Sequence, residues 1–423
     1  MISRLRHVLE GASIPVAAVL LGLVVSSAFV AIAGKQPLPT YAFMFCEGFG
    51  ARGCESFGHL LFVPVEEEDG SVNTHFAPTL GTRGHKLAIV LERATPLILT
   101  ALSATVAFRA GMFSIGQDGQ LVLGAVAAVF LGYWLPDQIY LLTGTSPDSA
   151  PPLQLALMRL TIPPVAMAAA MLVGAFYSWI AGILKVRLNV NELISTIILN
   201  AIAVQFVTFM VNFPLRADFN NIARTRTIDD TAWLTPFTRA LLNEVDWFRG
   251  SRLGIGLLLV LVAALIIWFF LHRTTAGYEQ RMTEGSRLFA RYGGIPSARA
   301  TLRAMLISGA LSGLAGALMI LGVERRIVDG FALGGTGFDG VLVAILARES
   351  VVGILLVASF FAGLEQGAIN LQFENLPRQL GGMIIAFMIL FASMEDFFRD
   401  NITRLRVRLF PESVAPSQSA SEA

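Results

Sequence analysis

The sequence predicts an all-α, polytopic membrane protein with about ten transmembrane helices. Its 423 residues are 55% hydrophobic and only 14% charged, and the mean hydropathy is +0.66. Soluble globular proteins of this length do not show that balance. Apolar runs of about 20 residues, the length that crosses a bilayer, recur along the chain. The 31 basic and 30 acidic residues nearly cancel, so their positions carry more information than their total.

The N-terminal segment predicts an uncleaved first span. The basic start ISRLRH and the apolar run 14–33, which ends in Ala31-Ile32-Ala33, follow the charge pattern of a signal peptide. A signal h-region covers only about 7 to 15 residues, so the longer run favours a span. Residues 35–86 are rich in Gly, Pro and acids and contain no apolar run long enough to cross. We expect an external loop or small cap there.

That loop contains the two cysteines of the chain, in CEGFGARGC. An external, oxidising compartment permits a disulfide between Cys46 and Cys54. Two free thiols are an equal alternative, because sequence spacing does not establish the geometry that a disulfide needs. Two cysteines are too few for a disulfide scaffold or a four-cysteine zinc site.

Charged residues orient the next spans. The second span is 87–108, the third ends near residue 135, and 136–152 contains acids but no Lys or Arg. The positive-inside rule therefore places 136–152 outside. The fourth span ends near residue 184, and Lys185 with Arg187 marks the following turn as cytoplasmic. A fifth span, 193–211, leads into a second external segment, 212–252, whose Trp233, Trp247 and Phe248 suit an interfacial belt.

The second half carries the most basic loop, 272–301, after a sixth span at 253–271. Six arginines face two glutamates between residues 272 and 303, so the loop is expected in the cytoplasm. Arg325 and Arg326 violate the rule, and no alternative topology removes the violation. The remaining expected spans are 302–322, the weak and short 337–347, 351–370 and 381–394. The span 302–322 has small residues at helical spacing, Gly309, Ser312, Gly313 and Gly316, which let another helix approach closely. Residues 1–400 then form a transmembrane domain with both ends inside, and 401–423 a basic, disordered cytoplasmic tail.

The stretch 113–125, FSIGQDGQLVLGA, combines three glycines with Asp118 between Gln117 and Gln120, and apolar stretches flank it. Non-helical backbone at membrane depth is tolerated only in protein or beside water, and an ionisable group there costs about 2.5 to 3.5 kcal/mol. We therefore interpret the stretch as a substrate pathway. The alternative is an ordinary cytoplasmic turn in which Asp118 caps a solvated helix.

A short internal echo links two of the spans. GQDGQLV at 116–122 recurs as GFDGVLV at 337–343, five spans later. Because an odd number of spans reverses orientation, a true repeat would be a five-plus-five inverted repeat, which many transporters use to form a substrate path. Chance is an equal explanation for so short a match. The second copy also fits a dinucleotide fingerprint, which we reject because no βαβ unit surrounds it.

Several kinds of chemistry are absent from the sequence. No phosphate loop of the G-x-x-x-x-G-K-[ST] type occurs, so this chain does not hydrolyse ATP by that route. The five histidines are scattered and no H-E-x-x-H motif occurs, which gives no sign of a metal site. We therefore expect no catalytic residue and no metal.

The basic loop contains a predicted two-turn helix. Ser286 is placed to cap it and Gly293-Gly294 to end it. Leu288, Phe289 and Tyr292 would then share one face, with arginines on the rim, a pattern that suits docking to a cytoplasmic partner. Contact with anionic lipid head groups is the alternative.

Four segments together resemble a known family: FRAGMFSIGQDGQLVLGA, LNVNELISTIILN, AGYEQRMTEGSRLFARYGGIPSARATLRAMLISGALSGLAGAL and GTGFDGVLVAILAR. They resemble the permease subunits of ABC importers in the branched-chain amino acid and ribose permease superfamily, nearest its nucleoside and simple-sugar subgroup. The resemblance runs from about residue 96 to 397 in the family's order. Ser114 stands where the family usually has Asn, and Asp118 where it has Glu.

The resemblance implies a permease in the cytoplasmic (inner) membrane that imports nucleosides or simple sugars by alternating access. A solute-binding protein would deliver the solute outside, and a second permease chain, indicated by the long external loop, would form a heterodimer with this one. Cytoplasmic ATPases with ATP and Mg²⁺ would drive transport, so this chain needs no cofactor of its own. No nucleic-acid partner is expected.

Polar residues that match the family's segments are the pathway candidates, with two aromatic side chains that a base can stack on. They are Phe113, Ser114, Gln117, Asp118, Gln120, Asn191, Glu192, Asn200, Phe338 and Asp339. For Asn200 and Glu192, helix packing or a cytoplasmic turn is an equal alternative. The residues expected to couple to the ATPase are Arg281, Glu284, Gly285, Ser286, Arg287, Leu288, Phe289, Arg291, Tyr292 and Gly294.

The competing hypothesis is an ion-coupled secondary transporter of a small polar metabolite. Asp118 and Asp339 would then hold a proton or sodium ion at the repeat interface. A receptor or scaffold without transport is disfavoured, because a protein without a transport path does not need polar residues within its membrane spans.

Overall fold

The computed structural model describes residues 20–49, 62–66, 72–76, 85–147, 149–217, 222–235, 252–374 and 378–393. These residues are mainly helical, which confirms the all-α prediction. The side chain of Cys46, all of Cys54 and the tail 401–423 lie outside the described part, so the disulfide and the tail stay predictions.

The chain divides into two compact units. The first unit comprises Met1–Phe45 and Gly367–Ala423. It contains the helix Leu20–Ile32, the start of α2 (Pro37–Phe49), η6 (Leu371–Glu374) and α14 (Arg378–Ser393). The chain bends by 114° between Leu20–Ile32 and α2. The expectation of a loop after residue 35 was therefore wrong at α2, whose apolar sequence PLPTYAFMF favours a helix.

The second unit, Cys46–Gln366, holds the candidate site. A two-stranded antiparallel hairpin, β1 (Phe62–Glu66) with β2 (Val72–Phe76), pairs Phe62 with Phe76. The helices that follow are α3 (His85–Phe108), α4 (Gln117–Thr143), α5 (Pro152–Leu188), α6 (Glu192–Asn212), η2 (Asp230–Ala232), α8 (Ile255–Arg273), α9 (Thr275–Gly285), α10 (Arg287–Tyr292), α11 (Ser297–Leu318), the π-helical η4 (Met319–Glu324), η5 (Phe331–Leu333), α12 (Thr336–Leu346) and α13 (Val351–Asn370).

Seven helices of the described residues are long and apolar enough to cross a membrane, or eight if the bent pair is one span. The polytopic prediction is confirmed, whereas the count of about ten is not. Two of the expected spans are short apolar helices, Phe331–Leu346 and Gln379–Met388. α12 has only 11 residues, about 16 Å of helix, which is half of a bilayer.

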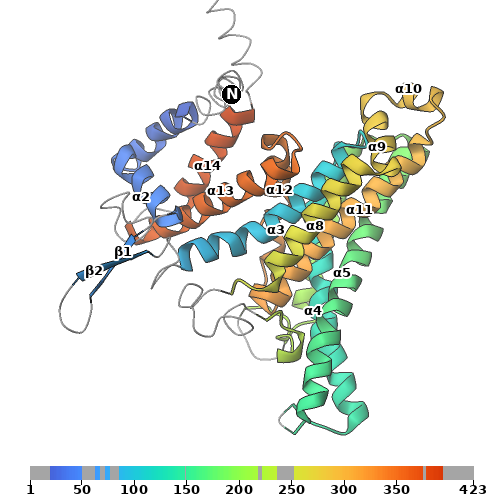
Figure 1. Ribbon diagram of the computed structural model, residues 1–423, viewed down its shortest axis with the longest axis horizontal. Coiled ribbons are helices and arrows are strands. Elements are labelled where there is room, and N and C mark those ends of the chain that lie inside the picture. The colour runs from blue at the N-terminus through green and yellow to red at the C-terminus, as the bar shows by residue number, and fades with distance from the viewer. Residues whose placement is uncertain are drawn as a thin grey trace, which may run out of the picture. The chain divides into compact units, whose positions relative to one another are not determined.

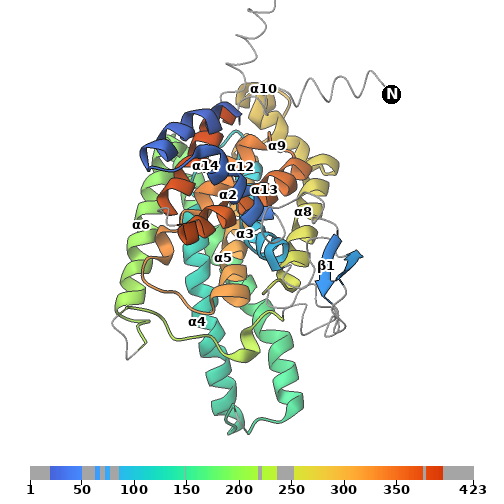
Figure 2. The same cartoon turned by 90° about the vertical axis from the view of Figure 1, so that its left-hand side faces the viewer.

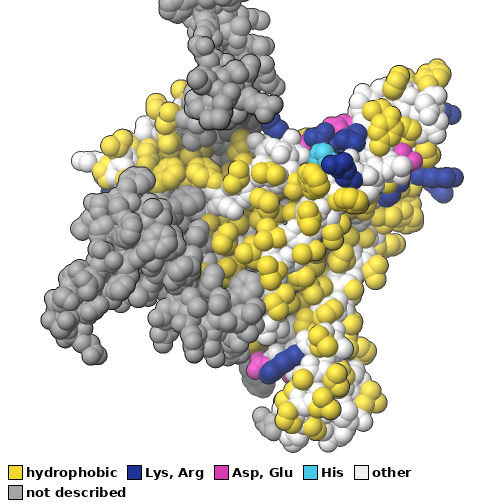
Figure 3. Space-filling model, viewed as in Figure 1, with side chains coloured by type: hydrophobic (Ala, Val, Ile, Leu, Met, Phe, Trp, Pro, Cys, Tyr) yellow, Lys and Arg dark blue, Asp and Glu magenta, His cyan; other side chains and the backbone are white. Residues whose placement is uncertain are grey.

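The first half of the predicted external turn 136–152 is helical. α4 continues through Pro136 to Thr143, and the left-handed Gly144 (φ 64°) ends it before α5 begins at Pro152. The two helices form the hairpin that projects at the opposite end of the unit from α9 and α10 (Figures 1 and 2). Charged side chains gather near α9 and α10 and on the hairpin side of the unit (Figure 3). Asp137 of α4 pairs with Arg226.

The core forms where α11 crosses α3, α4 and α5. A Cβ atom at Gly309 would overlap the carbonyl oxygen of Gly174, and one at Gly124 would lie 2.6 Å from the Cα of Gly313. These contacts confirm the prediction that the small residues of 302–322 let another helix approach closely. The buried hydroxyls of Ser103, Ser308 and Ser312 join α3 to α11 through hydrogen bonds of 2.8 to 2.9 Å.

Candidate functional site

Two helices begin inside the bundle and meet there, α4 at Gln117 and α12 at Thr336. The Asp118 carboxylate accepts hydrogen bonds from the backbone N–H groups of Gly337 (2.7 Å) and Phe338 (3.2 Å). The first N–H groups of a helix have no partner within that helix, and its N-terminus favours negative charge. Asp118 thus stabilises the start of α12 and joins the two helices into one junction.

The two copies of the internal echo contact each other at this junction. A Cβ at Gly337 would lie 2.6 Å from the Cα of Asp118. The matching glycines of the copies are also tightly packed: a Cβ at Gly119 would lie 2.9 Å from Asn200 Oδ1, and one at Gly340 2.9 Å from the nitrogen of Ala101. These contacts give both glycines the same packing role, and the five-plus-five repeat itself stays a prediction.

Asn200 on α6 holds the non-helical backbone that precedes α4. Its Nδ2 donates to the carbonyl of Ile115 (2.6 Å), and its Oδ1 accepts from the N–H of Gly119 (2.9 Å). Thr196, one turn earlier, accepts from the N–H of Ile115 (3.3 Å). Backbone groups in a bilayer interior need such partners, so α6 keeps the segment in its unwound form.

We expect Asn200→Ala to lower solute uptake about tenfold, because two backbone groups lose partners worth on the order of 1 kcal/mol each. Gln205→Ala removes an exposed amide from the same helix and serves as the matched control. Initial uptake rates, normalised to protein in the membrane, measure both variants. Equal rates for Asn200→Ala and the wild type would show that Asn200 only packs.

The other candidates around the junction divide into buried and exposed groups. Ser114, Gln117 and Gln120 are almost fully buried. Both amide atoms of Gln117 lack a hydrogen-bond partner among the described residues. Phe113 and Phe338 keep 45% and 43% of their surface exposed, and the Phe113 ring stacks on Phe108 with 4.9 Å between the ring centroids.

The basic loop contains two helices rather than the predicted one, α9 and α10. Ser286 ends α9 and caps α10, its hydroxyl accepting from the N–H of Phe289 (3.3 Å). Gly294 follows α10 with φ 77°, as the sequence predicted. Leu288, Phe289 and Tyr292 are 68% to 91% exposed, so α10 presents an apolar surface at the end of the unit.

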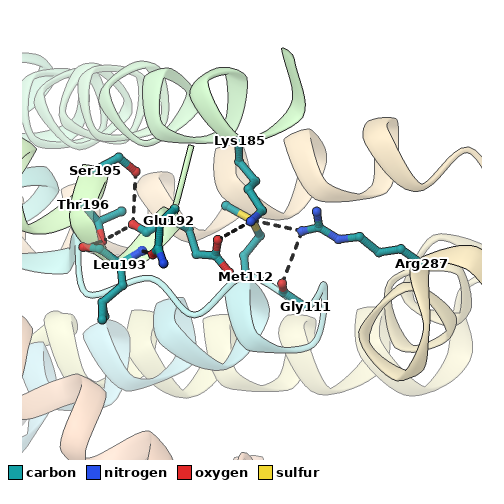
Figure 4. A network of polar contacts seen from close by, with 9 residues as sticks. Gly111, Met112, Lys185, Glu192, Leu193, Ser195, Thr196 and Arg287 are labelled. Atoms are coloured by element: carbon teal, nitrogen blue, oxygen red, sulfur yellow. Dashed lines mark hydrogen bonds and ion pairs between the residues drawn. The ribbon is translucent and has the colours of Figure 1, made fainter. Parts of the chain in front are cut away.

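The basic loop contacts the unwound segment directly. Arg287 donates to the carbonyl of Gly111 (3.4 Å) and to the sulfur of Met112 (3.5 Å), as Figure 4 shows. Nearby, Lys185 pairs with Glu192 across the turn between α5 and α6 (2.6 Å). Asn191 is exposed there and caps α6 by accepting from the N–H of Leu193 (2.9 Å). Asn191 and Glu192 therefore lie beside the basic loop, and Asp118 has neither as a hydrogen-bond partner.

Arg109 joins three elements at the same end of the unit. Its guanidinium lies 2.8 Å from Glu349, between α12 and α13, and 3.7 Å from Glu284 on α9. Burial raises the pKa of the Glu349 carboxyl above its ordinary value; Arg109 opposes this shift and Glu284 adds to it. The loop that the sequence assigns to ATPase coupling is thus connected to both α3 and α12.

Asp339, on the first turn of α12, lines a cavity. The cavity is also lined by Glu92, Arg93, Arg252 and Glu365. The sequence analysis did not select these four residues, although charges inside the apolar runs 87–108 and 351–370 were a usable signal for Glu92, Arg93 and Glu365. Among the described residues, no group of three or more His, Cys, Asp or Glu side chains is arranged to hold a metal.

Comparisons with known proteins agree with this architecture. Residues 87–393 match the family described as branched-chain amino acid transport system / permease component. The chain is 31% identical to the guanosine ABC transporter permease protein NupP of Bacillus subtilis, over 96% of this chain and 99% of the relative. It is 30% identical to the nucleoside ABC transporter permease protein NupB of Lactococcus lactis (76% and 82% covered). The glucose ABC transporter permease protein TsgB13 of Haloferax volcanii is 29% identical (77% and 80%).

No solved structure matches the chain. The family match covers well over half of its length, and NupP is matched over nearly its full length. The chain therefore belongs to the permease component family of the branched-chain amino acid transport systems and is a multi-pass permease subunit of an ABC transporter.

Proposed function

We propose that this chain forms part of the translocation path for nucleosides in an ABC importer of the cytoplasmic membrane. The observation that carries the proposal is the junction of α4 and α12. There, an acidic side chain inside the bundle holds the start of a half-length helix. Half-helices that start near the middle of a membrane form solute sites in other transporters, because irregular backbone is tolerated only beside a cavity.

The substrate class rests on the relatives. NupP and NupB are named for guanosine and nucleoside transport, and TsgB13 for glucose. Nucleosides are the first candidate because NupP matches 96% of this chain. Simple sugars are the second, and the exposed rings of Phe113 and Phe338 favour a solute with a base.

Three partners complete the proposed importer. Cytoplasmic ATPases, which bind ATP and Mg²⁺, would dock on α9 and α10, where Leu288, Phe289 and Tyr292 are exposed. Bacillus subtilis has a second relative named as a guanosine ABC transporter permease protein, NupQ, which supports a heterodimer of two permease chains. An external solute-binding protein would deliver the solute, and both termini of this chain would be cytoplasmic.

The ion-coupled alternative gains no support from relatives that are named as ABC permeases. Uptake of radiolabelled adenosine, guanosine and glucose into vesicles decides between the two. The vesicles contain this chain with its genomic neighbours, with or without internal ATP, and ionophores collapse the gradients. ATP-dependent uptake that survives the ionophores is expected. Uptake by this chain alone that stops when the gradient collapses would refute the proposal.

We expect the double variant Leu288→Ser with Tyr292→Ser to lose most ATP-driven uptake, because α10 then lacks the apolar side chains that a partner buries. Co-purification of the ATPase with the permease measures the docking step. Leu141→Ser with Leu142→Ser, which changes two exposed leucines at the far end of α4, is the matched control. ATPase retention by the α10 variant at the control level would place the docking surface elsewhere.

A further inference from the structure

A cavity of about 170 Å³ lies within the second unit, toward the ends of α8 and α11 that are remote from α9 and α10. Roughly 10 to 15 Å³ of such volume holds one water molecule, so the cavity has room for on the order of ten. Its charged lining among the described residues is Glu92, Arg93, Arg252, Glu324, Asp339 and Glu365. The first turn of α12 contributes Thr336 and Asp339 to the lining.

The lining has more hydrogen-bond acceptors than donors. Arg93 lies 3.7 Å from Glu365, and the guanidinium of Arg252 donates to the carbonyl of Val323 (2.7 Å). Arg252 thus already donates a hydrogen bond, whereas Arg93 is held in an ion pair and its buried Nε has no hydrogen-bond partner among the described residues. The carboxylate of Asp339 accepts no hydrogen bond from the described residues. A ligand that donates hydrogen bonds would supply the partner that this carboxylate lacks.

The remaining wall is apolar and has room for a side chain. Leu97, Leu257 and Met319 line it, together with Gly322 of η4. A Cβ at Gly322 would meet no atom within 4 Å. The backbone of η4 is π-helical here, and such turns occur frequently at functional sites because they widen the helix.

We infer that this cavity binds the sugar ring of the solute, with the vicinal hydroxyls on Asp339 and the apolar face against the leucine wall. The inference rests on the proposed function and assigns a recognition site to it. Adjacent hydroxyls suit a carboxylate because its two oxygens accept two donors together. A bound metal cation is disfavoured, because it needs a shell of oxygen ligands, and the carboxylates among the described residues do not gather in a group of three or more that could hold one.

The location gives the cavity a place in the transport path. The first turn of α12 contributes Thr336 and Asp339 to the lining, and Asp118 holds that same turn through the N–H groups of Gly337 and Phe338. Displacement of α12 would therefore change the cavity and the junction together. A solute bound to Asp339 lies in the same helix turn as the groups that keep α12 in place.

The test is equilibrium binding of radiolabelled adenosine, ribose and glucose to the full chain, assembled with its transport partners in nanodiscs. Gly322→Leu fills the cavity, and Asp339→Asn removes its unpartnered carboxylate. Each is expected to weaken adenosine and ribose binding at least tenfold. Gly382→Leu is the matched control, because a Cβ there also meets no atom within 4 Å and the residue lies outside the cavity. 2′,3′-Dideoxyadenosine, which lacks the diol, is expected to compete poorly.

The outcomes separate this inference from the proposed function. ATP-dependent adenosine uptake with unchanged apparent affinity in both cavity variants would overturn the inference and leave the function intact. Equal competition by dideoxyadenosine and adenosine, binding that needs Na⁺ or K⁺ but no hydroxyls, or no binding of any of the three probes would also overturn it. A wild-type assembly without ATP-dependent uptake would refute the function itself.

Discussion

Asp118→Ala is expected to abolish solute uptake while the protein still inserts into the membrane. The variant removes the acceptor for two backbone N–H groups of α12. A hydrogen bond to a charged group contributes about 1.5 to 3 kcal/mol, so losing both costs about 3 to 6 kcal/mol. Since each 1.4 kcal/mol is tenfold, a drop in uptake of more than a hundredfold is expected. Initial rates per unit of membrane-inserted protein measure it.

Two further variants sharpen this test. Asp118→Asn keeps one side-chain oxygen as an acceptor, so its uptake is expected to lie between those of the wild type and Asp118→Ala. Asp137→Ala removes a carboxylate from the same helix where it is exposed and pairs with Arg226; exposed pairs contribute at most about 1 kcal/mol, so uptake should stay near wild type. Normal transport by a folded Asp118→Ala protein would eliminate the junction as a functional element.

Gly309→Leu is expected to prevent stable folding. A Cβ at this position would overlap the carbonyl oxygen of Gly174 and lie 2.5 Å from the Cβ of Ser178. Neither neighbour moves unless α5 separates from α11. Overpacking costs about 1 to 3 kcal/mol where side chains can adjust, and more where backbone opposes it. The expected result is a lower unfolding midpoint in detergent and little full-length protein in the membrane.

The control for this substitution is again a glycine whose surroundings have room for a side chain. Gly382→Leu adds the same side chain to α14, where no atom lies within 4 Å of the new Cβ. Its unfolding midpoint is expected to equal that of the wild type. A Gly309→Leu protein as stable as Gly382→Leu would mean that α5 and α11 do not pack as closely as described.

Local features of the sequence were sufficient to predict the class of protein and the limits of several helices. Composition and apolar runs determine a polytopic helical membrane protein, because burial in a bilayer requires them. Ser286 and Gly294 predicted the limits of α10, since caps depend on residues next to the helix. The glycines of 302–322 predicted a close helix crossing, but the partner, Gly174, is not evident from their spacing.

Only the tertiary structure decided which polar residues come together at the junction and in the cavity. Asp118 bonds to backbone groups 219 residues away, and the cavity gathers Glu92, Arg252, Asp339 and Glu365 from separate parts of the chain. A hydrophobic pattern shows which residues of one segment face apolar surroundings. It does not identify the distant segment that supplies a polar partner. The half-length of α12 is the clearest case. Its sequence shows a weak span, and the packing of its first turn on Asp118 makes it a helix that starts inside the bundle.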